Sequence, residues 1–275
     1  MPRRRTTDPA SRSAALPWLT GIGVAVIAVL VGLLVVLALQ HARGDAAAPT
    51  STRPLPAYDA ETPTPTPTAV AVPPPGAEER FLAVGDGVLW RATAGACGGP
   101  APVIERSTDD GATWQDVTPT YRGIAQVLTL DPFAGDQAEA VALVGAGCEV
   151  QALRTFTSGR FWEPYAEVLA ASTYLDPVNT GMLVRPAGAV ATPCEEPWGL
   201  RARAGTVALV CEGVAYRLDP SGWVALSGAD AVAVAVAPDA VSVVTAGAAE
   251  APAAAWPEDD GLLVWTGAQL RTIAP

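Results

Sequence analysis

The chain contains no lysine and a single histidine, His41, and aromatic residues make up only 6% of it. Its basic side chains are 17 arginines against 28 acids, which gives a formal net charge of −11. An acidic chain without clustered cations binds nucleic acid poorly, because the phosphates must be neutralised by basic side chains. We therefore expect no nucleic-acid partner.

The scarcity of histidine and cysteine also limits the chemistry that the chain can perform. The residues after His41 include no histidine, which excludes a histidine base, a Ser-His-Asp triad and histidine metal ligands there. The four cysteines form no C-x-x-C pair, so a zinc site is poorly supported. Asp109 and Asp110 lack the ligand spacing of an EF-hand. We expect neither a metal nor a cofactor, and no catalytic residues.

Only one long apolar run is present, at residues 18–39, and it carries no ionisable side chain. Its 22 residues are enough for a helix to span a bilayer core of about 30 Å. Four arginines precede it, so the positive-inside rule places the N-terminus in the cytoplasm and the rest outside. The run has no GxxxG, and we expect no dimerisation through it. A cleaved signal peptide, with small residues at 46–48, is the alternative, but its apolar region is usually shorter.

These features predict four segments in a protein of the bacterial plasma membrane. They are a cytoplasmic basic tail at 1–17, a transmembrane helix at 18–39, an extracellular stalk at 40–77 and an extracellular domain at 78–275. The stalk is rich in Ala, Pro and Thr, and threonine alternates with proline at 62–67. Such a run forms neither helix nor sheet and acts as an extended spacer.

The domain at 78–275 shows short apolar runs separated by Gly, Pro, Asp and Ser. This spacing predicts an all-β sandwich, barrel or propeller. The six residues 231–236 alternate strictly between Ala and Val, which favours a strand over an amphipathic helix. The expected strands lie at 81–84, 88–91, 124–130, 140–144, 150–156, 206–210, 214–218, 231–236, 241–245 and 262–265.

Residues 107–114 read S-T-D-D-G-A-T-W, which has the form S-x-D-x-G-x-T-W. Asp109 can accept backbone N–H groups within a tight turn, and Gly111 can adopt a positive φ. Ser107, Thr113 and Trp114 complete a motif that resembles the Asp-box, or BNR repeat, of the sialidase-like β-propeller superfamily. The resemblance is to a single-pass, actinobacterial-type member, and it implies a structural box away from any active site. It also implies that Trp114 packs against the neighbouring blade.

Weaker copies of the motif follow at 155–162, 218–223 and 263–270. The tryptophans of successive copies, Trp114, Trp162 and Trp223, are 48 and 61 residues apart, and we interpret 184–197 as an inserted loop. A propeller blade takes about 40–50 residues, so the domain has room for four to five short antiparallel blades. Such a propeller is either short, or incomplete and completed by a partner or a second copy of the chain. A β-sandwich with one such turn is the alternative.

The four cysteines all lie in the predicted extracellular domain, where two disulfides are expected. Three connectivities exist for four cysteines. Cys97 and Cys148 follow similar Ala/Gly segments, just past a strand, and could lie in equivalent turns of adjacent blades. We therefore predict Cys97–Cys148 and Cys194–Cys211.

Three residues are candidates for binding. Arg201 and Arg203 alternate, so they share one face of a strand and could hold an anion. They could instead lie on a solvated face with acids such as Glu195 and Glu196. Trp198 could be an exposed binding aromatic or a loop anchor packed on the core.

The expected function is a non-enzymatic, membrane-anchored binding or scaffold module that acts on another envelope protein. The resemblance allows it, since propellers of the photosystem II assembly-factor family act in this way. The alternative is a carbohydrate-active protein, a lectin or a sialidase-like glycosidase, that acts on cell-wall glycan. A cleft lined by paired carboxylates and arginine would favour the alternative, whereas a flat face with exposed Trp or Phe would favour a binding module.

A sialidase-like site would also need three arginines and a tyrosine. Arg91, Arg122, Arg154, Arg185 and Tyr121 are available for it, but the Arg-Ile-Pro signature of that family is absent.

Overall fold

The computed structural model describes Leu34 and residues 72–274. The predicted tail at 1–17 and most of the transmembrane segment and stalk lie outside these residues. Across the described part of the chain, no helix combines the length and the apolar character needed to cross a membrane.

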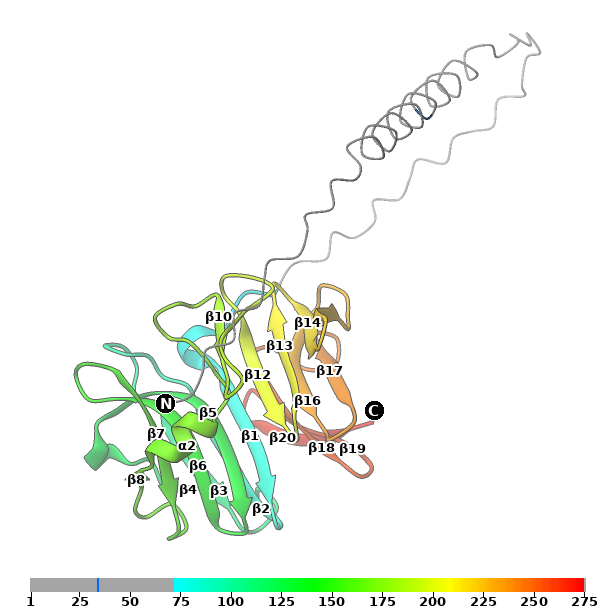
Figure 1. The fold of residues 1–275 in the computed structure, drawn as a ribbon. Helices are drawn as coiled ribbons and strands as arrows, with labels where there is room; N and C mark the ends of the chain where they lie inside the picture. The colour runs from blue at the N-terminus through cyan, green and yellow to red at the C-terminus, as the bar shows by residue number, and fades with distance from the viewer. Residues whose placement is uncertain (1–33, 35–71, 275) are drawn as a thin grey trace, which may run out of the picture. The chain divides into compact units, whose positions relative to one another are not determined.

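Residues 72–274 fold into six antiparallel sheets (Figure 1). Four consecutive strands form each of blades 1, 2 and 3, two form blade 4, and three form blade 5. Blade 1 contains β1 (Arg80–Gly85), β2 (Val88–Thr93), β3 (Val103–Ser107) and β4 (Gln115–Asp116). Blade 2 contains β5 (Ile124–Ala134), β6 (Gln137–Val144), β7 (Glu149–Thr155) and β8 (Glu163–Pro164). Blade 3 contains β12 (Trp198–Arg203), β13 (Thr206–Cys211), β14 (Val214–Asp219) and β15 (Gly222–Ala225). Blade 4 contains β16 (Ala231–Val236) and β17 (Val241–Thr245), and blade 5 contains β18 (Ala253–Glu258), β19 (Gly261–Thr266) and β20 (Gln269–Ile273).

The first strands of the five blades surround a common axis. Strand β1 contacts β5 and β18, and β16 contacts β18 and β12. All five first strands line one cavity. The blades therefore follow one another around the ring in chain order, which makes the domain an all-β, five-bladed propeller. The prediction of a propeller with four to five blades is confirmed.

The ring closes by packing between blades 5 and 1. Leu82 and Leu89 of blade 1 pack with Ala254, Leu263 and Trp265 of blade 5 in one buried cluster. Each blade is built from consecutive strands, so within residues 72–274 no blade shares strands between the two ends of the chain. Side-chain packing, rather than strand exchange, therefore joins the first and last blades.

An insertion between blades 2 and 3 is larger than the sequence predicts. It contains α2 (Ala166–Ala171) and a three-stranded sheet of β9 (Tyr174–Leu175), β10 (Met182–Val184) and β11 (Val190–Ala191). The prediction of an inserted loop at 184–197 is therefore wrong in two ways. The insertion begins earlier, and it contains a helix and a small sheet. Strands of two or three residues are too short to give a hydrophobic period.

The structure contains the disulfides Cys97–Cys148 and Cys194–Cys211, which is the expected pairing. The first joins the β2–β3 loop of blade 1 to the β6–β7 loop of blade 2, with 6.0 Å between the Cα atoms. These loops are equivalent in the two blades. The second joins the end of the insertion to β13, with a Cα separation of 5.7 Å.

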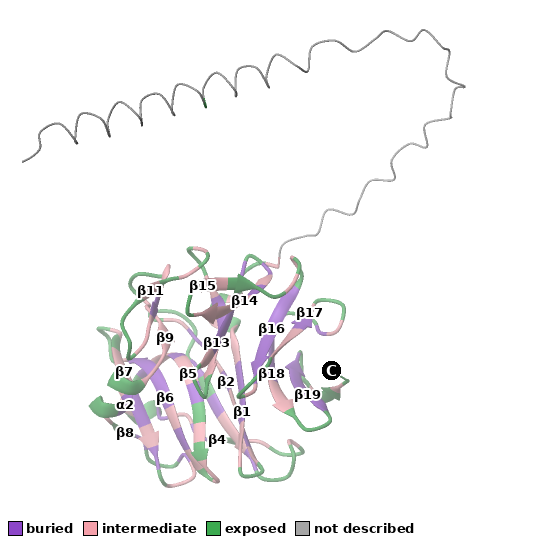
Figure 2. Cartoon of the chain, turned by 45° about the vertical axis from the view of Figure 1, so that its right-hand side comes forward, coloured by how far each residue is buried: buried purple, intermediate pink, exposed green. Residues whose placement is uncertain are grey.

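The buried residues lie mostly on the strands, as the purple segments in Figure 2 show, for example along β16. All six residues of β16 are buried, so the Ala/Val alternation does not mark an exposed face. Both faces of this strand contact other elements, because β16 packs against blades 3 and 5. Trp90 and Trp162 meet edge to face between blades 1 and 2, with ring centroids 6.2 Å apart.

Candidate functional site

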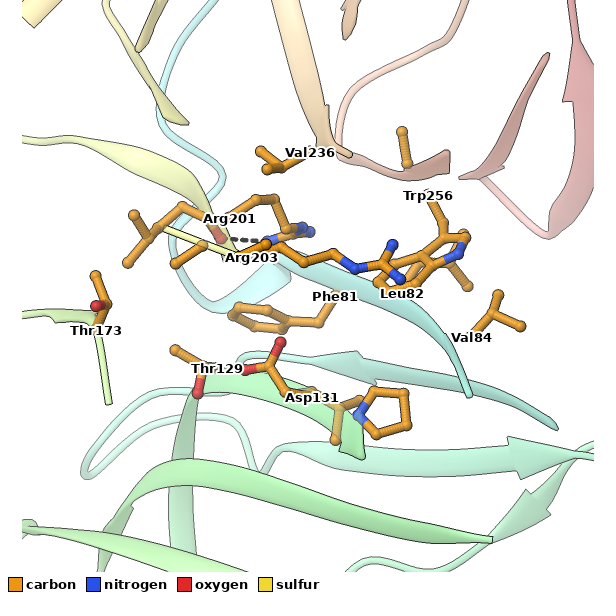
Figure 3. Close-up of a pocket in the computed structure, with 16 residues that line it drawn as sticks. Phe81, Leu82, Val84, Thr129, Asp131, Thr173, Arg201, Arg203, Val236 and Trp256 are labelled. Carbon is orange, nitrogen blue, oxygen red and sulfur yellow. Dashed lines mark hydrogen bonds between the residues drawn. The ribbon is translucent and has the colours of Figure 1, made fainter. Parts of the chain in front are cut away.

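The first strands of the blades converge on a cavity of about 310 Å³, which we call the channel cavity (Figure 3). Its lining comes mainly from β1, β5, β12, β16 and β18. The side chains used below are Phe81, Asp131, Thr173, Arg201, Arg203 and Trp256.

Two arginines of β12 enter the channel cavity. Arg201 donates from Nη1 to the Leu200 carbonyl and from Nη2 to the Arg80 carbonyl, both at 2.7 Å. Its guanidinium lies 5.2 Å from the centre of the Phe81 ring, and its buried Nε has no hydrogen-bond partner. Arg203 is exposed and lies 4.5 Å from the centre of the Trp256 ring. The prediction that the two arginines share one face is confirmed.

The acids nearest to these arginines are not the ones expected from the sequence. Among the described residues, neither Arg201 nor Arg203 forms an ion pair with Glu195 or Glu196. The acids whose charges act on Arg201 are Glu79 and Asp131. Burial lowers the pKa of Arg201, and these two acids oppose that shift.

Both acids are also perturbed. Burial raises the pKa of Glu79, although Arg201 and the Gly199 N–H, which donates to Glu79 Oε1 at 2.8 Å, act in the opposite direction. Asp131 is an exposed residue at the channel cavity, and partial desolvation of its carboxyl group there raises its pKa to about 6. Arg201 lowers this pKa and Glu139 raises it.

A second cavity of about 250 Å³ continues from the first between blade 2 and blade 3. We call the two cavities together the interblade groove. They share Thr129, Asp131, Thr173, Ala202, Arg203 and Ala204. Glu139 of β6 lines the second cavity and is the register partner of Asp131 in β5. Directly opposite residues of an antiparallel pair point to the same face. The groove thus holds two carboxylates as well as two arginines.

An aromatic patch adjoins the groove on the same face of blade 2. Arg154 of β7 forms an ion pair with Glu139 and lies within 5.7 Å of the ring centres of Phe133, Phe156 and Tyr165. Phe133 and Phe156 are 43% and 50% exposed and meet edge to face at 5.7 Å. We call Phe133, Arg154, Phe156 and Tyr165 the aromatic patch. The Glu139–Arg154 pair connects it to the groove.

Trp198 is not an exposed aromatic. It begins β12, is 3% exposed and belongs to the main buried cluster. It borders a separate cavity of about 290 Å³, which also contacts Glu79, Glu196 and Pro197. The reading of Trp198 as an anchor packed on the core is therefore the correct one, and the residue does not line the interblade groove.

The Asp-box forms the β3–β4 turn. Asp109 accepts the Thr113 N–H at 2.9 Å, the Thr113 hydroxyl at 2.6 Å and the Ser107 hydroxyl at 2.7 Å. The hydrogen bonds from Thr113 and Ser107 lower the pKa of Asp109 to about 2. Gly111 has a φ of 85°, and Trp114 packs in the cluster between blades 1 and 5. The box is thus a structural turn that contacts the neighbouring blade, as the resemblance implies.

The segment 155–162 reproduces this turn with hydroxyls in place of the carboxylate. The Gly159 N–H donates to Thr155 Oγ1 at 3.0 Å, as Gly111 does to Ser107 Oγ at 2.9 Å. The Phe161 N–H donates to Thr157 Oγ1 at 2.9 Å, so Thr157 replaces Asp109. Of the other copies, 218–223 spans the β14–β15 turn, whereas 263–270 spans β19–β20, which are the second and third strands of their blade.

The residues considered for a sialidase-like site do not converge. Arg91 pairs with Glu105, Arg122 with Glu163 and Arg154 with Glu139. The Arg185 Nε donates to the Gly188 carbonyl within the insertion, and the Tyr121 hydroxyl donates to the Trp162 carbonyl. These side chains belong to different blades and loops, so they do not form a common substrate site.

The sequence reasoning missed Asp131, Glu139 and Trp256. One signal was present: Thr129, Asp131 and Phe133 alternate along a strand, so one face of β5 carries polar and aromatic groups. The pairing of Asp131 with Glu139 depends on strand register, which the sequence does not reveal. The approach of Arg203 to Trp256 depends on how the blades close into a ring.

Similarity to known proteins is found among solved structures. No family model matches the sequence, and no curated protein matches it. Among solved structures, YCF48 bound to D1 peptide is 16% identical, with a TM-score of 0.32, over 70% of this chain and 66% of that one. YCF48 from Cyanidioschyzon merolae is 15% identical, with a TM-score of 0.25, over 75% of this chain and 59% of that one. This chain therefore spans less than two thirds of the length of either structure.

Proposed function

We propose that the chain is a non-enzymatic binding module, anchored in the bacterial plasma membrane by residues 18–39, whose propeller acts outside the cell as a scaffold for an envelope protein. The observation that carries this proposal is the exposed aromatic patch beside the interblade groove. Aromatic residues and arginine are enriched in protein interfaces, where they contribute most of the binding energy. The exposed rings of Phe133 and Phe156, with Arg154 between them, have this composition.

Two further features support the proposal. The two disulfides are typical of proteins in an oxidising compartment outside the cytoplasm. Two charged side chains of the groove are held in fixed positions, since Arg201 is bonded to two backbone carbonyls and Glu139 is paired with Arg154. Fixed side chains suit recognition, because little conformational entropy is lost on binding.

The test is affinity purification of the full-length protein from its own membranes after mild crosslinking. We expect one stoichiometric envelope protein with the wild type, and its loss with the double variant Phe133→Ala, Phe156→Ala. Phe161→Ala is the matched control, because Phe161 is 64% exposed and makes no ring pair with the patch. Equal recovery from the double variant and the control would contradict the role of the patch. Detection of residues 1–17 outside the cell would contradict the orientation.

A carbohydrate-active protein is the second candidate, and the pair of Asp131 and Glu139 favours it. Glycosidases use one protonated and one ionised carboxyl group, set apart by their surroundings. Here Asp131 has a raised pKa, while Glu139 pairs with an arginine. Hydrolysis of cell-wall glycan by the wild type, lost in both Asp131→Asn and Glu139→Gln, would establish this function. Absence of hydrolysis with retained glycan would indicate a lectin.

A further inference from the structure

The interblade groove contains two arginines that have no ion-pair partner among the described residues, within an acidic domain. Residues 78–275 contain 11 arginines and 24 acids. Nevertheless, in the part of the chain that the structure describes, Arg201 and Arg203 lie within ion-pair distance of no carboxylate. The buried Nε of Arg201 also has no acceptor. The charge of these two guanidinium groups is therefore only partly compensated by the protein.

The channel cavity has a suitable size and shape for a small group that carries a charge. Its volume is about 310 Å³. Phe81 and Trp256 lie against the two guanidinium groups. Both Nη atoms of Arg201 donate to backbone carbonyls, whereas Arg203 is exposed and presents its N–H edge for other contacts. A planar carboxylate matches such N–H edges, because it can accept two parallel hydrogen bonds.

Asp131 lies across the channel cavity from these arginines (Figure 3). The charged groups that act on it are Arg201 and Arg203 from β12 and Glu139 from β6. The cavity residues of β16 and β18 are Val236, Ala255 and Trp256, none of which titrates. A protonated Asp131 would donate a hydrogen bond to a bound carboxylate, whereas an ionised Asp131 would repel it.

We propose that the interblade groove binds its ligand by a carboxylate group, held by Arg201 and Arg203, and that Asp131 takes up a proton when this ligand binds. This inference rests on the proposed binding function and names the ligand chemistry. A single carboxylate fits better than a dianionic phosphate, because Glu79 and Asp131 already place acids near the arginines. Binding then weakens as the pH rises through the range in which Asp131 ionises.

The test is calorimetric titration of the full-length protein at pH 5.0 and pH 7.5. Benzoate represents a free apolar carboxylate and glucuronate an acidic sugar, with benzamide and glucose as their uncharged controls. We expect one of the two carboxylates to bind about tenfold more tightly at pH 5.0 than at pH 7.5. Its uncharged control is expected not to bind at either pH. The preferred carboxylate identifies the source of the ligand, either a free acid or an acidic glycan.

Three variants make the result specific. Arg203→Gln is expected to weaken binding at least tenfold, whereas Arg160→Gln, which removes an exposed arginine outside the groove, is expected to leave it unchanged. Asp131→Asn is expected to bind at pH 7.5 as tightly as the wild type does at pH 5.0. Circular dichroism of each variant checks that it is folded.

No saturable binding, equal affinity at both pH values, or equal effects of the two arginine variants would overturn the inference. Its failure is distinguishable from failure of the proposed function. If neither carboxylate binds but the Phe133→Ala, Phe156→Ala variant still loses its protein partner, the binding module stands and only the carboxylate site is refuted.

Discussion

Replacement of Trp162 by phenylalanine tests how the blades are held together. The Trp162 indole is fully buried and donates from Nε1 to the carbonyls of Val117 at 3.1 Å and Gly159 at 2.9 Å. It therefore links the 155–162 turn of blade 2 to blade 1. Phenylalanine keeps a ring beside Trp90 but removes the donor. A buried carbonyl without a partner costs about 1–3 kcal/mol, and the lost ring area of roughly 40 Å² adds about 1 kcal/mol.

We therefore expect Trp162→Phe to lower the free energy of unfolding by about 3 kcal/mol. For a domain of this size that corresponds to a fall in Tm of about 6–12 °C. The assay is denaturant and thermal unfolding followed by far-ultraviolet circular dichroism, which does not depend on the removed fluorophore. Phe161→Ala is the control and is expected to change stability by less than about 0.5 kcal/mol. A Trp162→Phe effect below about 1 kcal/mol, or no greater than that of Phe161→Ala, would refute the role of the indole.

Three further predictions concern acids and a disulfide. Because the pKa of Asp131 rises from 3.8 to about 6 on folding, its stabilising contribution is present below about pH 4 and is lost as the pH rises through about 6. Asp131→Asn should therefore unfold at a higher Tm than the wild type at pH 7.5 and at a similar Tm at pH 4; a lower Tm at pH 7.5 would contradict this. The pKa of Asp109 falls from 3.8 to about 2, so its contribution is present above about pH 4 and is lost as the pH falls through about 2. Asp109→Asn should lower Tm at pH 7, with a difference that shrinks towards pH 2, and a constant difference would count against this. Cys194→Ser opens a loop with a sequence separation of 17 and should cost about 3 kcal/mol in denaturant unfolding, while an unchanged midpoint would show that packing alone holds the insertion.

The strand pattern was accessible from the sequence where apolar runs are continuous. Each of the ten expected strands overlaps a strand of the structure, for example 206–210 within β13 and 231–236 as β16. The Asp-box residues were also identified correctly, because a tight turn requires its own residue types at fixed spacing. The strands that were missed include short ones of two to four residues, such as β4 and β8, and longer ones of five or six residues, namely β3, β12, β18 and β20. In β12, a residue with positive φ, Gly199, shifts the register between Trp198 and Arg201.

The candidate site could be predicted only in part. Arg201 and Arg203 were found because alternation along a strand is a local property. Arg203 lies over the Trp256 ring, and the charges of both arginines act on Asp131. These residues are more than 50 positions apart in the sequence, so no local pattern predicts that they come together. The burial of Trp198 could not be predicted, because two acids and a proline precede it and such a segment is typical of a surface loop. In the structure the innermost strand of blade 3 begins at this residue.

The central claim is that the aromatic patch and the interblade groove beside it contact a partner protein. The most direct measurement places a photo-activated crosslinking amino acid at Phe156 of the full-length chain in its own membranes. The same probe at Val178, which is 92% exposed on the insertion, is the control. The account predicts one crosslinked envelope protein from position 156 that is absent from position 178. Crosslinks of equal yield at both positions, or none at position 156, would contradict it.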